Sequence, residues 1–136
     1  LGDVYKSQMV VLVSMGIEEL SATLGVSRTA VTELERHGLI SSRTVGQASI
    51  YDESALLITR LCLKLLKLGL DARHLRMYLI AAQREAGVLE QLLLGRLTTG
   101  DGASRSSARR DLEDLVEVGA QLRQLLLQQI LREFNR

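Results

Sequence analysis

Residue types that carry enzyme chemistry occur in this sequence, but their spacing groups none of them into a recognisable site. No Ser-His-Asp arrangement, Cys-His arrangement or pair of carboxylates stands at a spacing typical of catalysis. His37 and His74 are far apart, and Cys62 is the only cysteine, so the sequence offers no clustered metal ligands. We therefore expect no enzymatic activity, no metal site and no cofactor, and we expect Cys62 to lie in the core.

Basic side chains are the remaining candidates, because they can contact phosphate groups or acidic surfaces. Arg28 and Arg43 are the candidates for contacts with DNA phosphates. Surface arginines are usually solvated, so solvation and phosphate contact are both open for these two residues. Arg36 has Glu33 and Glu35 within reach on the same helix, which predicts an intramolecular ion pair.

The most basic segment of the sequence lies between residues 60 and 84. Its only carboxylate is Asp71, and its cations are Arg60, Lys64, Lys67, Arg73, Arg76 and Arg84. Two interpretations are open. The segment is either the solvated outer face of two amphipathic helices, or a surface that docks on DNA, on RNA polymerase or on a sister domain.

The overall composition indicates a small globular domain without a strong electrostatic field. Lys and Arg number 17 against 16 Asp and Glu, so any basic surface must be local. Hydrophobic residues make up 46% of the chain and aromatic residues 3%, which favours an aliphatic core over a stacking platform for nucleic acid. No apolar run is long enough to span a membrane, and cysteine is rare, so we expect a cytoplasmic protein without a membrane partner. The chain begins at Leu1 rather than Met, so we expect an internal fragment.

The basic residues must be positioned by helices, and apolar spacing predicts where these lie. Apolar residues at helical spacing predict one helix over residues 17–24 and a second over residues 28–37, separated by a tight turn. Ser27 suits the N-cap of the second helix, and Gly38 suits the position just after its end. Short β-like pieces between residues 39 and 51 predict a hairpin.

Two further helices follow the hairpin. Asp52 caps the first, whose apolar residues at helical spacing include Leu61 and which ends at Gly69. Asp71 starts the next, which turns Leu75 and Tyr78 inward and continues past a glycine to residue 97. Small polar residues then predict a linker.

The last predicted helix is longer than a domain of this size needs for its own core. From residue 108 to residue 134 it would measure roughly 40 Å at 1.5 Å per residue. Its wide apolar face requires a partner, and the nearest partner is a second copy of the chain. The predicted dimer-interface residues are Leu112, Leu115, Val116, Leu122, Leu126 and Ile130.

Three segments resemble motifs of the MerR family of transcription regulators. They are residues 17–27 with 35–40, residues 51–56 and residues 68–75, in the same order and spacing as in that family. The resemblance implies a mainly α fold, in which a winged helix-turn-helix with a small β wing is followed by a long C-terminal dimerisation helix. The implied domains are an N-terminal extension (1–16), the winged helix-turn-helix domain (17–97), a linker (98–107) and the dimerisation helix (108–136).

This sequence departs from the family pattern at two places where family members contact DNA. The DNA-reading members carry an Arg followed by an aromatic residue in the recognition helix, whereas this chain has Thr32, Glu33 and Leu34. They also carry Arg beside the wing, whereas residues 45–59 contain no basic residue. Phosphate contacts supply most DNA affinity, and a carboxylate repels phosphate, so these departures weaken DNA binding.

The pattern over residues 71–76 is similar to the C-terminal, MerR-like domain of FtsR-type regulators of actinobacteria. In those regulators the N-terminal MerR-like copy binds DNA, and the C-terminal copy is the effector-binding or dimerisation domain. The resemblance implies that this chain is such a regulatory domain, a homodimer whose full-length protein binds promoter DNA. RNA polymerase or another protein is a further candidate partner.

Two alternatives to this interpretation stay open at the level of sequence. The first is a direct, sequence-specific DNA-binding winged-helix domain that uses Arg28 and Arg43. The second is a small-molecule sensor with an apolar pocket between the helices next to the wing and the long helix.

Overall fold

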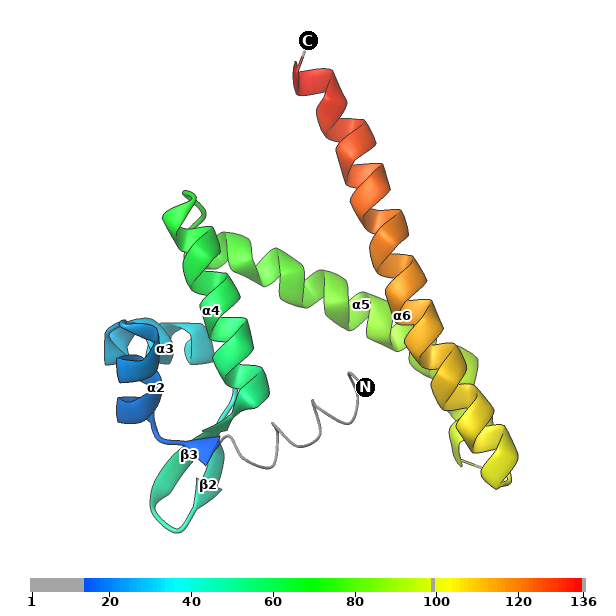
Figure 1. The fold of residues 1–136 in the computed structure, drawn as a ribbon, viewed down its shortest axis with the longest axis horizontal. Helices are drawn as coiled ribbons and strands as arrows, with labels where there is room; N and C mark the ends of the chain where they lie inside the picture. The colour runs from blue at the N-terminus through cyan, green and yellow to red at the C-terminus, as the bar shows by residue number, and fades with distance from the viewer. Residues whose placement is uncertain (1–13, 99, 136) are drawn as a thin grey trace. The chain divides into compact units, whose positions relative to one another are not determined.

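The computed structural model of the chain describes residues 14–98 and 100–135 and is mainly helical, with a small antiparallel sheet and a long C-terminal helix (Figure 1). The chain divides into two compact units, residues 1–81 and residues 82–136. Residues 1–13 of the predicted N-terminal extension lie outside the described residues. Of its remainder, Ser14–Met15 form the short strand β1.

The first unit begins with the two predicted helices and the turn between them. They are α2 (Ile17–Leu24) and α3 (Arg28–Arg36). Gly25 closes α2 in the left-handed conformation at φ 67°, which a residue with a side chain rarely adopts. Ser27 Oγ accepts a hydrogen bond of 3.1 Å from the Ala30 amide, so the predicted N-cap of α3 is confirmed.

The predicted hairpin is formed by β2 (Arg43–Val45) and β3 (Ala48–Asp52), which pair with Arg43 opposite Ile50. Gly46 occupies the tight turn between them at φ 64°. On its other side β3 pairs antiparallel with β1, which gives the strand order β1-β3-β2. The strand β1 has no counterpart among the sequence predictions, because two residues are too few to show an alternating pattern.

The helix α4 (Glu53–Lys67) follows β3 directly, and α5 (Ala72–Thr98) begins after a short turn. Both starts are capped as predicted: Asp52 Oδ1 accepts from the Ala55 amide at 2.9 Å, and Asp71 Oδ1 accepts from the His74 amide at 3.1 Å. The elements of this unit share one core. Its buried side chains are Leu20, Val31, Leu34, Ile40, Tyr51, Ala55, Cys62 and Leu75.

The burial of individual side chains partly follows the apolar pattern. Cys62 and Leu75 are buried, as predicted. Leu61 is exposed instead, because α4 buries the side of the helix that carries Ala55, Thr59 and Cys62. The prediction that Tyr78 points inward is wrong, since half of its surface is exposed.

The second unit consists of the remainder of α5, the helix α6 (Gly102–Leu131) and a final 3-10 turn, η1 (Arg132–Asn135). Leu93 of α5 and Ala108 of α6 are its fully buried side chains among the described residues. Arg96 forms an ion pair of 2.9 Å with Asp111, so the end of α5 packs beside the start of α6.

The helix α6 starts earlier than predicted. Asp101 Oδ1 accepts a hydrogen bond of 2.8 Å from the Ser104 amide, which places the N-cap at Asp101 and makes residues 102–107 of the predicted linker helical. With its 30 residues, α6 is about 45 Å long at 1.5 Å per residue. The predicted long C-terminal helix is therefore present, with an additional turn and a half at its start.

Candidate interaction surfaces

Arg28, one of the two candidates for DNA contact, is the first residue of α3. Its Nη1 lies 2.6 Å from Glu18 Oε1, on the neighbouring helix α2. Both side chains are largely exposed, so the pair itself contributes little stability. Its consequence is electrostatic: a phosphate that approached Arg28 would meet the Glu18 carboxylate at the same place.

The exposed side of α3 contains a second such pair, as predicted. Arg36 Nη1 lies 3.2 Å from Glu33 Oε2, and the other oxygen of Glu33 lies 3.6 Å from His37 Nε2. Thr32 is exposed between these residues and Arg28, and its hydroxyl donates to the Arg28 carbonyl at 2.9 Å. Each arginine of α3 is therefore accompanied by a carboxylate.

Arg43, the other candidate for DNA contact, is exposed at the start of β2. No ion pair involves it within residues 14–98 and 100–135. The tip of the hairpin next to it is uncharged, with Val45, Gly46 and Gln47 all exposed. The structure thus keeps Arg28 and Arg43 on different elements, with an uncharged hairpin tip beside the latter.

A part-buried polar contact that the sequence did not reveal joins α3 to the hairpin. The Tyr51 hydroxyl of β3 donates to Glu35 Oε1 at 2.5 Å, and Ser42 Oγ donates to Glu35 Oε2 at 3.1 Å. Burial and, to a smaller extent, the hydrogen bond to Glu35 together raise the pKa of the Tyr51 phenol to about 12. The apolar pattern marks Tyr51 only as a strand residue, and Glu35 only as a neighbour of Arg36.

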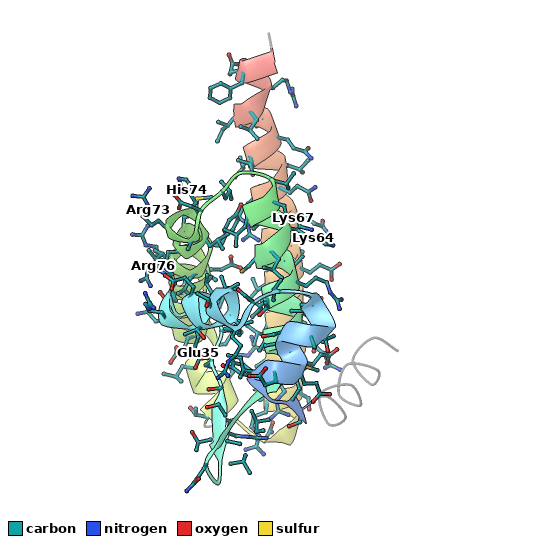
Figure 2. All side chains as sticks on the ribbon, turned by 90° about the vertical axis from the view of Figure 1, so that its left-hand side faces the viewer. Glu35, Lys64, Lys67, Arg73, His74 and Arg76 are labelled. Carbon is teal, nitrogen blue, oxygen red and sulfur yellow. The ribbon has the colours of Figure 1, made fainter. Side chains whose placement is uncertain are left out.

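The basic segment between residues 60 and 84 is divided by the fold into separate groups (Figure 2). Arg73 pairs with Asp71 at 3.2 Å, and Arg76 donates to the His37 carbonyl at the end of α3 at 2.8 Å. Lys64 and Lys67 lie on α4, on the opposite side of this unit from Arg73 and Arg76 in that view. They line a groove with Arg60, also on α4.

The predicted dimer-interface residues all lie on α6. Leu112 and Leu115 are half-buried where α6 packs beside α5, whereas Val116, Leu122, Leu126 and Ile130 are 49–61% exposed. A shallow groove of about 360 Å³ runs along this part of α6. It is lined by Glu85, Gly119, Leu122, Arg123, Leu126, Leu127 and Ile130.

A single ion pair marks the edge of this groove. Arg123 Nη1 lies 3.0 Å from Glu85 Oε1. The rest of the groove wall is aliphatic. The face is therefore suited to apolar packing rather than to polar recognition.

Residues 14–98 and 100–135 contain neither clustered metal ligands nor a membrane span. Among them, no group of three or more His, Cys, Asp or Glu side chains could hold a metal ion. No helix in the same residues is long and apolar enough to cross a membrane.

Comparison with known proteins gives one match. The family model of the Rv1828-like, C-terminal domain matches residues 13–135, nearly the entire chain. The chain belongs to this family. Neither a curated protein nor a solved structure matches it. The Rv1828-like assignment indicates a regulator-type domain.

Proposed function

We propose that this Rv1828-like domain is the regulatory and dimerisation module of a cytoplasmic MerR-type transcription regulator of the FtsR type. In this proposal α2, α3, the β2–β3 hairpin and α4 are a winged helix-turn-helix that no longer reads DNA. The module has no enzymatic activity. Promoter DNA is bound by the rest of the full-length protein, and RNA polymerase or another protein is a candidate partner of the assembled dimer.

The observation that carries the proposal is the apolar row on the second half of α6. Val116, Leu122, Leu126 and Ile130 are exposed there, although each is a large aliphatic side chain. Water-soluble monomers rarely leave contiguous apolar patches of more than a few hundred Å² uncovered. A second copy supplies a matching aliphatic row on its own α6, and two identical rows related by a two-fold axis cover one another.

The charge distribution on α3 supports a regulatory role over direct DNA reading. A recognition helix needs free cations for phosphates and donors for base edges. Here Arg28 is held by Glu18 and Arg36 by Glu33. Each phosphate contact would have to displace or approach a carboxylate, which costs most of the electrostatic gain.

The proposal is tested with Leu126→Asp. A carboxylate in the centre of an aliphatic dimer interface is desolvated without a partner, so the variant should be a folded monomer. Light scattering measures the molar mass, and circular dichroism shows whether the helices are retained. Gln128→Asp is the matched control, because it adds the same charge on the opposite side of the same helix and should remain dimeric. A dimeric Leu126→Asp variant would place the interface elsewhere.

A further inference from the structure

A groove of about 530 Å³ lies in the first unit, between the end of α2 with its turn and the last turns of α4. Its two sides differ in chemistry. Leu24, Val26, Leu63 and Leu66 supply apolar surface, and Arg60, Lys64 and Lys67 supply charge. The three cations come from one helix at positions i, i+4 and i+7, so they form a single row along α4.

Among the described residues, these three cations differ from Arg28, Arg36 and Arg73, each of which has a carboxylate partner. Within residues 14–98 and 100–135, no acidic side chain lines the groove and no ion pair involves Arg60, Lys64 or Lys67. All three side chains are exposed. The row therefore presents uncompensated positive charge beside an apolar surface.

We propose that this groove is the docking site of an acidic amphipathic helix from another protein. Leucine-like side chains of that helix would cover the apolar side formed by Leu24, Val26, Leu63 and Leu66. Its carboxylates would pair with the row of Arg60, Lys64 and Lys67. The cations recur about every helical turn, roughly 5.4 Å, which is also the repeat of carboxylates along one side of a docked helix.

The apolar surface favours a protein partner over nucleic acid. A phosphodiester backbone has no apolar groups to cover four aliphatic side chains. Among the described residues, no aromatic side chain lines the groove for stacking with a base. The proposal is independent of the proposed dimer, because the groove lies in residues 23–67 and the apolar row on α6 lies in residues 116–130.

The experiment uses the full chain and a labelled synthetic peptide of about 18 residues, long enough to become helical on binding. The peptide has leucines along one side and glutamates flanking that side. Binding is measured by fluorescence anisotropy at low and at physiological ionic strength. The test variant is K64Q/K67Q. The matched control is R109Q/R110Q, which removes the same charge from exposed positions of α6.

We expect K64Q/K67Q to bind the peptide roughly fivefold to tenfold more weakly than the wild type, and R109Q/R110Q to bind it with unchanged affinity. A peptide with lysines in place of the glutamates should not bind the wild type. The same lysine peptide should bind K64E/K67E. Binding should weaken as ionic strength rises.

Three results would overturn the proposal. One is equal affinity of the wild type and K64Q/K67Q for the peptide. Another is an equal loss of affinity in both double variants, which would show attraction by net charge alone. The third is tighter binding of a duplex DNA of the same net charge that also depends on Lys64 and Lys67, which would assign the groove to nucleic acid.

Discussion

Glu35 connects the hairpin to α3 at the level of single residues. Its two carboxylate oxygens accept from Tyr51 of β3 and from Ser42 of the loop that leads into β2. Tyr51 is only 3% exposed, so water does not replace its hydrogen bond if the partner is lost. One carboxylate and two hydroxyls therefore add to the core packing that holds the hairpin against α3.

Tyr51→Phe tests this connection. The variant keeps the ring in the core but removes a hydrogen bond to a carboxylate, so the free energy of unfolding should fall by about 2 kcal/mol. Ser42→Ala removes the second donor, which is only half-buried, and should cost about 1 kcal/mol or less. Urea denaturation measures the free energy of unfolding of both variants. A Tyr51→Phe variant as stable as the wild type would contradict the role given to this contact.

The same contact predicts a dependence of stability on alkaline pH. The pKa of Tyr51 rises from 10.0 in the unfolded chain to about 12 in the folded one. Its contribution to stability is therefore complete below pH 10 and is lost as the pH rises from 10 towards 12. Urea denaturation between pH 9 and pH 11.5 should show that the free energy of unfolding of the wild type falls as the pH rises. The fall should be smaller for Tyr51→Phe. Identical declines would assign the pH dependence to other groups.

Cys62 offers an internal reporter of stability. It is 6% exposed, and burial raises the pKa of its thiol, so both access and reactivity are low in the folded state. Ellman's reagent should therefore label the native chain at least about a hundredfold more slowly than the chain in urea. Because Cys62 is the only cysteine, the whole signal comes from it. Rapid labelling of the native protein would show that α4 opens locally.

The ion pairs on α3 show what the sequence can predict about a side chain and what it cannot. The Arg36–Glu33 pair follows from helical spacing and was predictable. The Arg28–Glu18 pair joins two helices, so it depends on how α2 and α3 cross, which spacing within one helix does not specify. The contact of Tyr51 with Glu35 crosses from a strand to a helix and was missed for the same reason.

At the scale of elements, boundaries were predictable where a cap residue precedes a periodic segment. Ser27, Asp52 and Asp71 mark the starts of α3, α4 and α5, and each accepts the expected amide hydrogen bond. The start of α6 was predicted too late, because Gly102 and the small residues after it are typical of a linker. Asp101 is a cap as good as the others, and it outweighs the low helix propensity of Gly102.

The cap at Asp101 predicts an acid-sensitive start of α6. The hydrogen bonds from Ser104, first its amide and then its hydroxyl, lower the pKa of Asp101 below its usual value of 3.8. The carboxylate therefore stabilises the helix above pH 3.8, and this contribution is lost as the pH falls through the lower folded value. In hydrogen exchange, the amides of Ser104 and Arg105 should lose protection in Asp101→Ala.

Two matched variants separate capping from general charge effects. Asp101→Asn keeps an oxygen acceptor, so the amides of Ser104 and Arg105 should stay protected from hydrogen exchange at neutral pH. Their protection should no longer depend on acidic pH, because the asparagine side chain does not titrate. Asp114→Asn removes a charge from the exposed middle of α6 and should leave exchange at Ser104 unchanged. Unaltered exchange in Asp101→Ala would mean that the first turn of α6 does not depend on this cap.

Burial on α4 and α5 shows the limit of apolar spacing. The α4 pattern includes many leucines, so several faces of the helix are apolar, and the spacing alone does not decide which one is buried. The structure buries the narrow side with Ala55 and Thr59, where the Thr59 hydroxyl donates to the Ala55 carbonyl at 2.7 Å. Leu56, Leu65 and Leu66 are only partly buried at the edge of the same core.

At the scale of the whole molecule, the two proposed surfaces were predictable to different degrees. The apolar length of α6 exceeds what one small domain can cover, so the sequence already indicates a partner for it. The basic groove was visible only as an excess of positive charge along residues 60–84. The fold divides this charge: Arg73 pairs with Asp71, and Arg76 donates to the end of α3. Among the residues that the structure describes, the row on α4 forms no ion pair.

The chain should bind duplex DNA only non-specifically. With Arg28 and Arg36 accompanied by carboxylates and Arg43 beside an uncharged hairpin tip, α3 and the hairpin offer too few cations for several phosphate contacts. We expect residues 1–136 to bind duplex DNA with a dissociation constant of about 10⁻⁴ to 10⁻⁶ M, the range of non-specific binding. Fluorescence anisotropy at two salt concentrations should give equal affinities for a palindromic duplex and for a scrambled duplex of the same length. As a positive control, Glu18→Gln with Glu33→Gln frees both arginines and should tighten binding to both duplexes equally, because phosphate contacts carry no sequence information. Nanomolar, sequence-selective binding by the unaltered chain would overturn the regulatory proposal in favour of direct DNA reading, with Arg28 and Arg43 as the first residues to replace.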